Sequence, residues 1–318
     1  MILGIDEVGD FAINSEQFHF FLVVQLDQNK NGIEIKKKQF SDWLKTIPEE
    51  KINDNGEVKG TDLTDEELYE FAKHVIAADP ITRILQVRVV PAENPPELIE
   101  KFKEIEIGRI QGAIEYYQKH GNQQIAKDLQ KLTYWYKNRN YQHFLKMLVL
   151  HRAISEALNE TIGISILLSF LPGNEEEKNL LNIKLKIDRD FINGPQPRIF
   201  WGEILRNAIR EYSQAKPIPV LDTWKDTGHP FLEKYKTPDG KLNFKDILKE
   251  NCHFFHSHEH FEIQMADIAG NIVHRYQNRG RCKDAYDKLV EPIRKEQIDI
   301  IHLKLNPNPT DDNEIFIE

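Results

Sequence analysis

The sequence predicts an α/β protein in which helices flank a mixed sheet and a helical insertion interrupts the order of strands. Strand-like runs open the chain at 2–6 and 18–27, and a helical pattern then continues almost unbroken from about 95 to 160. Strands and helices resume after this block, an order typical of a mixed sheet covered by helices. We expect one domain over 1–318, with the helical insertion at 92–160.

The individual elements follow from periodicity and end signals. The run "FHFFLVVQLD" is apolar at every position from 20 to 24, which favours a strand buried on both faces. A capping box, with Thr64 three positions before Glu67, marks the start of a helix. Further strands are expected in "ITRILQVRVV", "TIGISILLSFL", "LLNIKLKIDRDF" and "CHFFHSHEHF". Helices are expected in "RIFWGEILRNAIREY" and "EIQMADIAGNIVHRYQN", and the tail "NPNPTDDNEIFIE" is expected to be loosely held.

Composition narrows the class of protein. The chain has 318 residues, a formal net charge of −9 and only two cysteines, Cys252 and Cys282. Two cysteines cannot form a disulfide framework, which fits the reducing cytoplasm. No apolar run approaches the roughly 20 residues of a membrane span, so we expect a cytoplasmic protein with no membrane partner. Nucleic-acid binding then needs a local basic patch, because the whole molecule is acidic.

The first group of acidic residues ends the opening strand, in "MILGIDEVGD". Strand residues alternate between faces, so Asp6 shares a face with Ile2 and Gly4 while Glu7 points the other way. Carboxylates at the end of a core strand are suitable ligands for a hard divalent cation, and Asp6 is the stronger candidate. The alternative is a polar turn around Gly9.

A second acid follows a later strand, in "KIDRDF". Alternation puts Asp188 on the polar face of that strand, together with Lys184 and Lys186. This face either lines a cleft, with the lysines near a phosphate backbone, or is simply solvated.

A third acid, Asp267, lies in the late helix, within a stripe of polar residues at helical spacing. The stripe consists of His260, Gln264, Asp267, Asn271 and His274. Small residues surround Asp267 and allow a helix to press close to a sheet, so we expect its carboxylate to be at least partly buried. A buried charge is costly unless it is paired or bound to metal. The alternative is an aspartate that is hydrogen-bonded within a helix–sheet contact.

A fourth group, in "EVKGTDL", precedes the helix that begins near Thr64. It contains Glu57, Lys59 and Asp62, and Gly60 allows close approach of the backbone. A charged loop without chemistry has the same appearance.

An acid on the first strand, one on a later strand and one on a late helix together suggest a ribonuclease H-like arrangement. Clustered carboxylates raise one another's pKa unless cations lie between them. Two Mg²⁺ or Mn²⁺ ions about 4 Å apart would satisfy them and support phosphodiester hydrolysis.

Four segments, "IDEVGDF", "EVKGTDL", "KIDRDF" and "IQMADIAG", resemble in order the landmark motifs of the family called domain of unknown function 3800. Val8 stands where that family usually has serine. The family is similar to ribonuclease H-like nucleases. The residues that the resemblance implicates as catalytic are Asp6, Glu7, Glu57, Lys59, Asp188 and Asp267. Gln264, three positions before Asp267, also matches the family's pattern and is a candidate contact for the substrate.

The expected function is therefore a metal-dependent nuclease or phosphodiesterase that uses two Mg²⁺ or Mn²⁺ ions. Asp6, Asp188 and Asp267 would bind the ions, with Glu57 or Glu7 completing the site. Lys59 would orient a phosphate or stabilise developing charge. Two alternatives remain: a non-catalytic protein that binds nucleic acid or another partner on the same fold, and a phosphohydrolase of small molecules. The oligomeric state is open, with a homo-oligomer among the alternatives.

Two basic segments are candidate contacts for nucleic acid. Between Lys127 and Arg152 there are six basic residues and one acid, interleaved with aromatic residues. This combination is typical of single-strand binding, but core packing of Tyr134, Trp135 and Phe144 is the commoner explanation. Lys137 and Arg139 are the candidates there. Arg275, beyond Asp267, either holds a phosphate or caps a helix end.

The segment "CHFFHSHEH" invites a transition-metal interpretation. On a continuous strand, Cys252, His256, His258 and His260 would share one face. The spacing matches no zinc motif, so the alternative is a polar edge of the site or of the surface.

Overall fold

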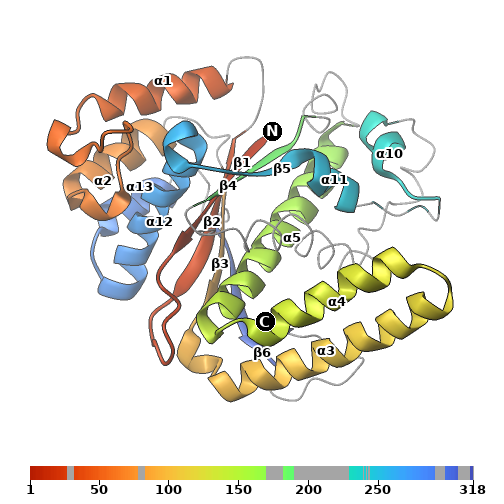
Figure 1. The fold of residues 1–318 in the computed structure, drawn as a ribbon. Coiled ribbons are helices and arrows are strands. Elements are labelled where there is room, and N and C mark those ends of the chain that lie inside the picture. Colours follow the sequence, from red (N-terminus) through yellow and green to blue (C-terminus); the bar gives the residue numbers. More distant parts are fainter. Residues whose placement is uncertain are drawn as a thin grey trace.

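The structure is a computed structural model of the chain, shown in Figure 1. It describes residues 1–26, 32–77, 83–169, 182–189, 229–238, 240, 242, 244–290, 298–306 and 316–317. The helix expected in "RIFWGEILRNAIREY" lies outside these residues.

A mixed sheet with the strand order β5-β4-β1-β2-β3-β6-β7 forms the centre of the fold. The strands β1 (Ile2–Val8), β2 (His19–Leu26) and β3 (Arg83–Val89) are joined as antiparallel neighbours. On one side β4 (Lys184–Asp188) lies parallel to β1, and β5 (Cys252–Phe255) lies parallel to β4. On the other side β6 (Ile298–Leu305) lies parallel to β3 and pairs with the short β7 (Phe316–Ile317).

Helices cover both faces of this sheet (Figure 1). One face carries α1 (Gly32–Leu44), α2 (Asp65–Phe71), the π-helical turn η3 (Ala72–Ile76), α12 (Phe261–Arg279) and α13 (Lys283–Val290). The other carries α3 (Pro96–Lys119), α4 (Gln123–Asn138), α5 (Tyr141–Ser169), α10 (Pro230–Tyr235) and α11 (Phe244–Asn251). Short 3₁₀ turns lie at Glu49–Lys51 (η1), Gly60–Asp62 (η2), Pro91–Glu93 (η4) and Ser257–Glu259 (η7).

The two apolar layers explain the composition of the central strands. In β2, Phe20, Leu22 and Val24 pack against the α12 face, whereas Phe21 and Val23 pack against the α5 face. Because side chains alternate along a strand, a strand covered on both sides is apolar at every position. The prediction that this run is buried on both faces is confirmed.

Helix α12 lies unusually close to β1, because glycines form the contact. A Cβ atom on Gly4 would be 2.2 Å from the backbone oxygen of Glu262, and one on Gly270 would be 2.5 Å from Cγ2 of Val8. Reciprocal side-chain hydrogen bonds between Gln86 on β3 and Gln277 at 2.9 and 3.0 Å fix the later part of the helix. These contacts align α12 along β1.

The structure confirms some expected elements and corrects others. Helix α2 begins with the predicted capping box, in which Thr64 and Glu67 exchange hydrogen bonds. The strand expected in "TIGISILLSFL" is wrong for 161–169, which continue α5 as helix, so the helical segment reaches Ser169 rather than 160. An all-apolar run fits a buried helix as well as a strand. Strand β6 was not predicted, and part of the expected loose tail, Phe316–Ile317, pairs with it.

Among the helices that the structure describes, none combines the length and the apolar character that crossing a bilayer requires.

The glycine contact predicts a specific sensitivity of stability. Gly4→Ala is expected to lower the free energy of unfolding by about 2 kcal/mol, because its methyl group overlaps the backbone of α12. Gly108→Ala is the matched control, since a Cβ there meets nothing within 4 Å in α3. It should stabilise the protein by about 0.5–1 kcal/mol. Urea denaturation of both variants measures the two effects, and an equal effect of both substitutions would contradict the close helix–strand contact.

Candidate active site

Two neighbouring parallel strands each carry an acid on the face that α12 covers: Asp6 lies two residues before the end of β1, and Asp188 is the last residue of β4. In the β1–β4 ladder Ile5 pairs with Ile187, so Asp6 and Asp188, one residue further along each strand, lie side by side. Both side chains are buried. Parallel strands bring their carboxyl ends to the same edge, which is how two residues 182 positions apart in sequence become neighbours.

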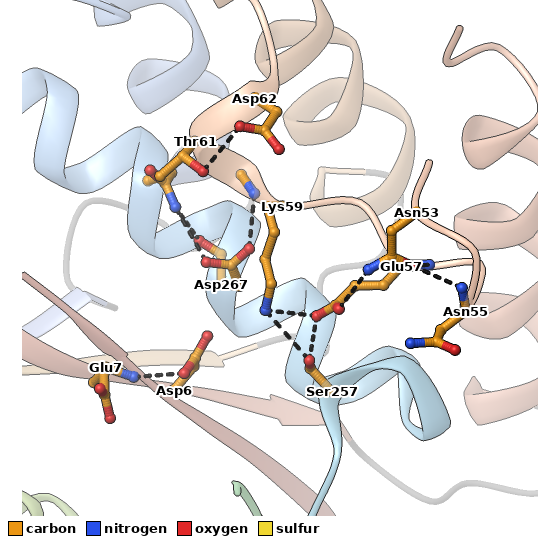
Figure 2. A network of polar contacts seen from close by, with 12 residues as sticks. Asp6, Glu7, Asn53, Asn55, Glu57, Lys59, Thr61, Asp62, Ser257 and Asp267 are labelled. Carbon is orange, nitrogen blue, oxygen red and sulfur yellow. Dashed lines mark hydrogen bonds and ion pairs between the residues drawn. The ribbon is translucent and has the colours of Figure 1, made fainter. Parts of the chain in front are cut away.

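Asp267 reaches the same region from α12 (Figure 2). Its Oδ2 accepts a 2.7 Å hydrogen bond from the backbone N–H of Gly60, and its Oδ1 accepts one of 3.2 Å from Nδ2 of Asn271. Gly60 must be glycine for this contact, because a Cβ there would be 2.6 Å from Nδ2 of Asn271. The loop at Lys59–Gly60 is therefore docked directly onto the helix.

The three carboxylates interact electrostatically. Burial, together with the charges of Asp267 and Asp188, raises the pKa of Asp6 well above its usual value. Burial also raises the pKa of Asp267 to about 6, although the hydrogen bond from Gly60 and the charge of Lys59 oppose the shift. Such shifts are expected where like charges share a site of low dielectric constant. The arrangement therefore concentrates negative charge that favours a bound cation.

Lys59 supplies positive charge to this region (Figure 2). Its Nζ is 2.6 Å from Oε1 of Glu57 and 3.5 Å from Oγ of Ser257. Ser257 Oγ donates a hydrogen bond to Oε1 of Glu57, and Asn53 Nδ2 donates one of 3.1 Å to its Oε2. Glu57, Lys59 and Ser257 thus form a closed triangle beside the aspartates.

Hydrogen bonds and neighbouring charges favour the ionised forms of Glu57 and Lys59. Burial acts to raise the pKa of Glu57, but hydrogen bonds from Lys59 and Ser257 outweigh it and lower that pKa. Partial burial acts to lower the pKa of Lys59. The hydrogen bond to Glu57 and the negative charges of Glu57, Asp267 and Asp188 outweigh this effect and raise the pKa above its usual value. Lys59 is therefore a permanent cation at neutral pH, suited to binding an anion and unsuited to accepting a proton.

Ser257 is a site residue that the sequence reasoning missed. It is buried in η7, inside the histidine-rich segment, and it contacts both Glu57 and Lys59. A serine flanked by histidines carries no spacing signal of its own. Its contact with a loop 200 positions earlier is visible only in the fold.

Glu7 points away from this site, as strand alternation predicts. Its Oε1 forms a 2.6 Å ion pair with Nζ of Lys146 on α5, on the opposite face of the sheet. The structure therefore does not bring Glu7 together with Asp6, although the resemblance implicates both.

Arg275 holds the Lys59–Gly60 loop in place. Its guanidinium donates to the backbone oxygens of Gly60 and Thr61 at 3.1 and 3.0 Å, and to Oδ1 of Asp65 at 2.9 Å. Asp65 also accepts hydrogen bonds from Arg281. These contacts make Arg275 a support of the loop, and its predicted contact with a phosphate stays a prediction.

The remaining predicted substrate contacts divide between two places. Gln264 is buried one turn before Asp267, and its Oε1 has no hydrogen-bond partner among the residues that the structure describes. Lys137 is exposed on α4, and the Arg139 guanidinium lies 4.9 Å from the ring centre of Trp135. Because α4 belongs to the α5 face of the sheet, the structure does not bring Lys137 or Arg139 to the carboxylates.

The histidine-rich segment is not one continuous strand, so the expected shared face of its metal-binding residues is wrong. Strand β5 ends at Phe255 and the chain turns through η7. Ring nitrogens of His256 and His260 instead lie 3.2 and 3.1 Å from the cationic groups of Arg189 and Lys186. Within the described ranges, no three His, Cys, Asp or Glu side chains form a ready-made metal-binding group, either here or at the aspartates.

The raised pKa of Asp6 predicts how its substitution changes stability with pH. A folded-state pKa above the unfolded value gives stability at low pH that is lost as the pH rises through it. Asp6→Asn, which keeps an acceptor for the N–H of Glu7, is expected to raise the free energy of unfolding at pH 8 in EDTA, with a smaller gain toward pH 4. Urea denaturation across this range measures it. Equal destabilisation at both pH values would contradict the electrostatic account.

The support from Arg275 predicts a contrast between two arginines that share Asp65. The Arg275 side chain is only 11% exposed, whereas that of Arg281 is 59% exposed. Arg275→Ala is expected to lower the free energy of unfolding by about 2 kcal/mol and to speed hydrogen exchange at the Gly60 amide. Arg281→Ala should change the free energy by less than about 1 kcal/mol and leave that exchange slow. Equal losses of stability in Arg275→Ala and Arg281→Ala would show that the contact with Asp65, and not the contacts with the loop carbonyl oxygens, supports the loop.

No protein-family model, curated protein or solved structure matches the chain. The side chains gathered at β1, β4, α12 and the Lys59–Gly60 loop are therefore the basis on which a function is assigned.

Proposed function

We propose that the protein is a metal-dependent nuclease that hydrolyses phosphodiester bonds of nucleic acid. One observation carries this proposal: Asp6, Asp188 and Asp267 reach one face of the sheet from three elements and interact electrostatically. A protein gains no stability from burying three acids together, since each opposes ionisation of the others. Such groupings are characteristic of functional sites.

The order of elements supports a ribonuclease H-like fold as part of the proposal. Asp6 lies on the first strand, Asp188 on the adjacent parallel strand and Asp267 on a late helix. The sequence suggests this same arrangement. The four motifs that resemble those of the family called domain of unknown function 3800 contribute Asp6, Lys59, Asp188 and Asp267 to this one region. Membership of that family is proposed on this ground.

The residues fit divalent cations by the chemistry of their donors. Asp6, Asp188 and Asp267 offer the hard carboxylate oxygens that Mg²⁺ and Mn²⁺ prefer, and the buried Oε1 of Gln264 adds a further oxygen without a partner in the described chain. These residues would hold the two ions. When bound there, the ions would supply activation of water and stabilisation of the leaving oxygen.

The protein's own groups would position the phosphate. Lys59 is a fixed cation that faces the aspartates, and Glu57 with Ser257 restrains its Nζ. In this role it attracts a phosphate oxygen and stabilises negative charge that develops on it. Docking of Gly60 on Asp267 keeps Lys59 beside the acids, and Arg275 keeps that loop docked.

A non-catalytic nucleic-acid-binding protein is the second candidate, and Lys59 is the observation that favours it. Its ammonium already supplies charge opposite Glu57 and near Asp267 and Asp188. This ammonium offsets part of the negative charge of the site without a divalent ion. Cleavage assays separate the two candidates.

Cleavage of labelled single- and double-stranded DNA and RNA with Mg²⁺ or Mn²⁺ tests the proposal. Asp6→Asn, Asp267→Asn and Lys59→Ala are each expected to lower the cleavage rate by about 100-fold or more, through lost cation binding or lost phosphate stabilisation. Glu7→Gln is the matched variant, because its side chain lies on the opposite face. It should retain the rate within about fivefold.

Two outcomes would contradict the proposal. Activity that survives both Asp6→Asn and Asp267→Asn would remove the carboxylates from the chemistry. Absence of cleavage with every substrate and both ions, in protein that binds nucleic acid, would favour the non-catalytic candidate.

A further inference from the structure

Helix α4 exposes one side along its whole length. Its inward face is apolar, with buried Ala126, Leu132, Trp135 and Tyr136 packed into the core beneath. The exposed positions recur every three or four residues, as one face of a helix requires. They are Gln123, Gln124, Lys127, Gln130, Lys131, Tyr134, Lys137 and Asn138.

Positive charge is concentrated on this exposed side. Three lysines stand there against a single acid on α4, Asp128, in a protein whose net charge is −9. Asp128 is 3.3 Å from Lys131 and also accepts a hydrogen bond from Gln124. We call the row formed by Lys127, Lys131, Tyr134 and Lys137 the α4 stripe.

An exposed aromatic ring lies in the middle of the stripe. Tyr134 is 67% exposed, the highest value among the large apolar side chains that the structure exposes. The sequence favours core packing of Tyr134, Trp135 and Phe144. The structure buries Trp135 and Phe144, but for Tyr134 this prediction is wrong. A tyrosine in water between lysines offers a flat face for stacking and adjacent charges for phosphates.

We propose that the α4 stripe binds single-stranded nucleic acid, with Tyr134 stacked on a base and the three lysines at the phosphates. Charge complementarity selects a polyanion, and the exposed ring selects an unpaired base, since bases in a duplex are stacked on each other. The stripe is about 15 Å long at 1.5 Å per residue, which corresponds to roughly four nucleotides.

This inference rests on the proposed function for the class of ligand and adds that the strand is single. It concerns a surface apart from the carboxylates, because α4 and α12 belong to opposite faces of the sheet (Figure 1). Binding at the stripe therefore requires no divalent ion, and the two proposals can fail separately.

Fluorescence anisotropy with labelled 12-nucleotide oligothymidylate and oligouridylate, and with a 12-base-pair duplex, tests the proposal in EDTA. The wild-type chain should bind single strands more tightly than the duplex. The triple variant K127E/K131E/K137E should bind at least about tenfold more weakly at 50 mM salt, and the slope of log K against log salt should fall in magnitude by about 2.

Matched variants separate the stripe from general effects of charge and of tyrosine loss. K45E/K73E/K283E changes net charge equally, at the turn after α1, in η3 and in α13 on the opposite face, and should leave affinity within about threefold. Tyr134→Ala should weaken binding by about fivefold or more, and Tyr134→Phe should retain it. Tyr116→Ala removes a tyrosine that is 57% exposed on α3 and should change little.

Several results would overturn the proposal. These are equal losses in the two triple variants, equal effects of Tyr134→Ala and Tyr116→Ala, duplex binding as tight as single-strand binding, and no binding by the wild-type chain. Asp6→Asn in the same assay should bind no more weakly than the wild type. Absence of cleavage by the wild-type chain, with stripe-dependent binding retained, would therefore contradict only the proposed function.

Discussion

The contact between α12 and β1 is the constraint on which the rest of the structure depends. The helix lies directly on the strand because Gly4 and Gly270 have no side chains at the points of closest approach. This closeness places Asp267 over the strand ends that carry Asp6 and Asp188, and it removes water from them. Buried acids without compensation are costly, so the neighbouring polar contacts all serve to balance or to position this charge.

The cation that offsets part of this charge is Lys59, which lies in the Lys59–Gly60 loop. Gly60 anchors the loop to Asp267, and Arg275, which follows two turns later on α12, holds the loop's carbonyl oxygens. Lys59 is consequently delivered to the acids, and Glu57 with Ser257 fixes its ammonium. One helix thus supplies a carboxylate, carries the support for the opposing cation and closes the space between them.

The sequence predicts the parts of this site that follow from local periodicity. Alternation along the first strand separates Asp6 from Glu7 correctly, because a strand has only two faces. Residues 161–169 were assigned to the wrong element, since an all-apolar run lacks a diagnostic period. The roles of Ser257 and Arg275 depend on partners about 200 positions away, which only the tertiary fold brings into contact.

We propose that Asp6, Asp188 and Asp267 form a cation site that Lys59 faces. Anomalous diffraction from crystals soaked in Mn²⁺ tests it most directly, because it locates the ions without requiring activity. Anomalous peaks are expected between these three carboxylates in the wild-type protein, and they should be lost in Asp6→Asn. Absence of a peak there at saturating Mn²⁺, with Lys59 still paired to Glu57, would contradict it.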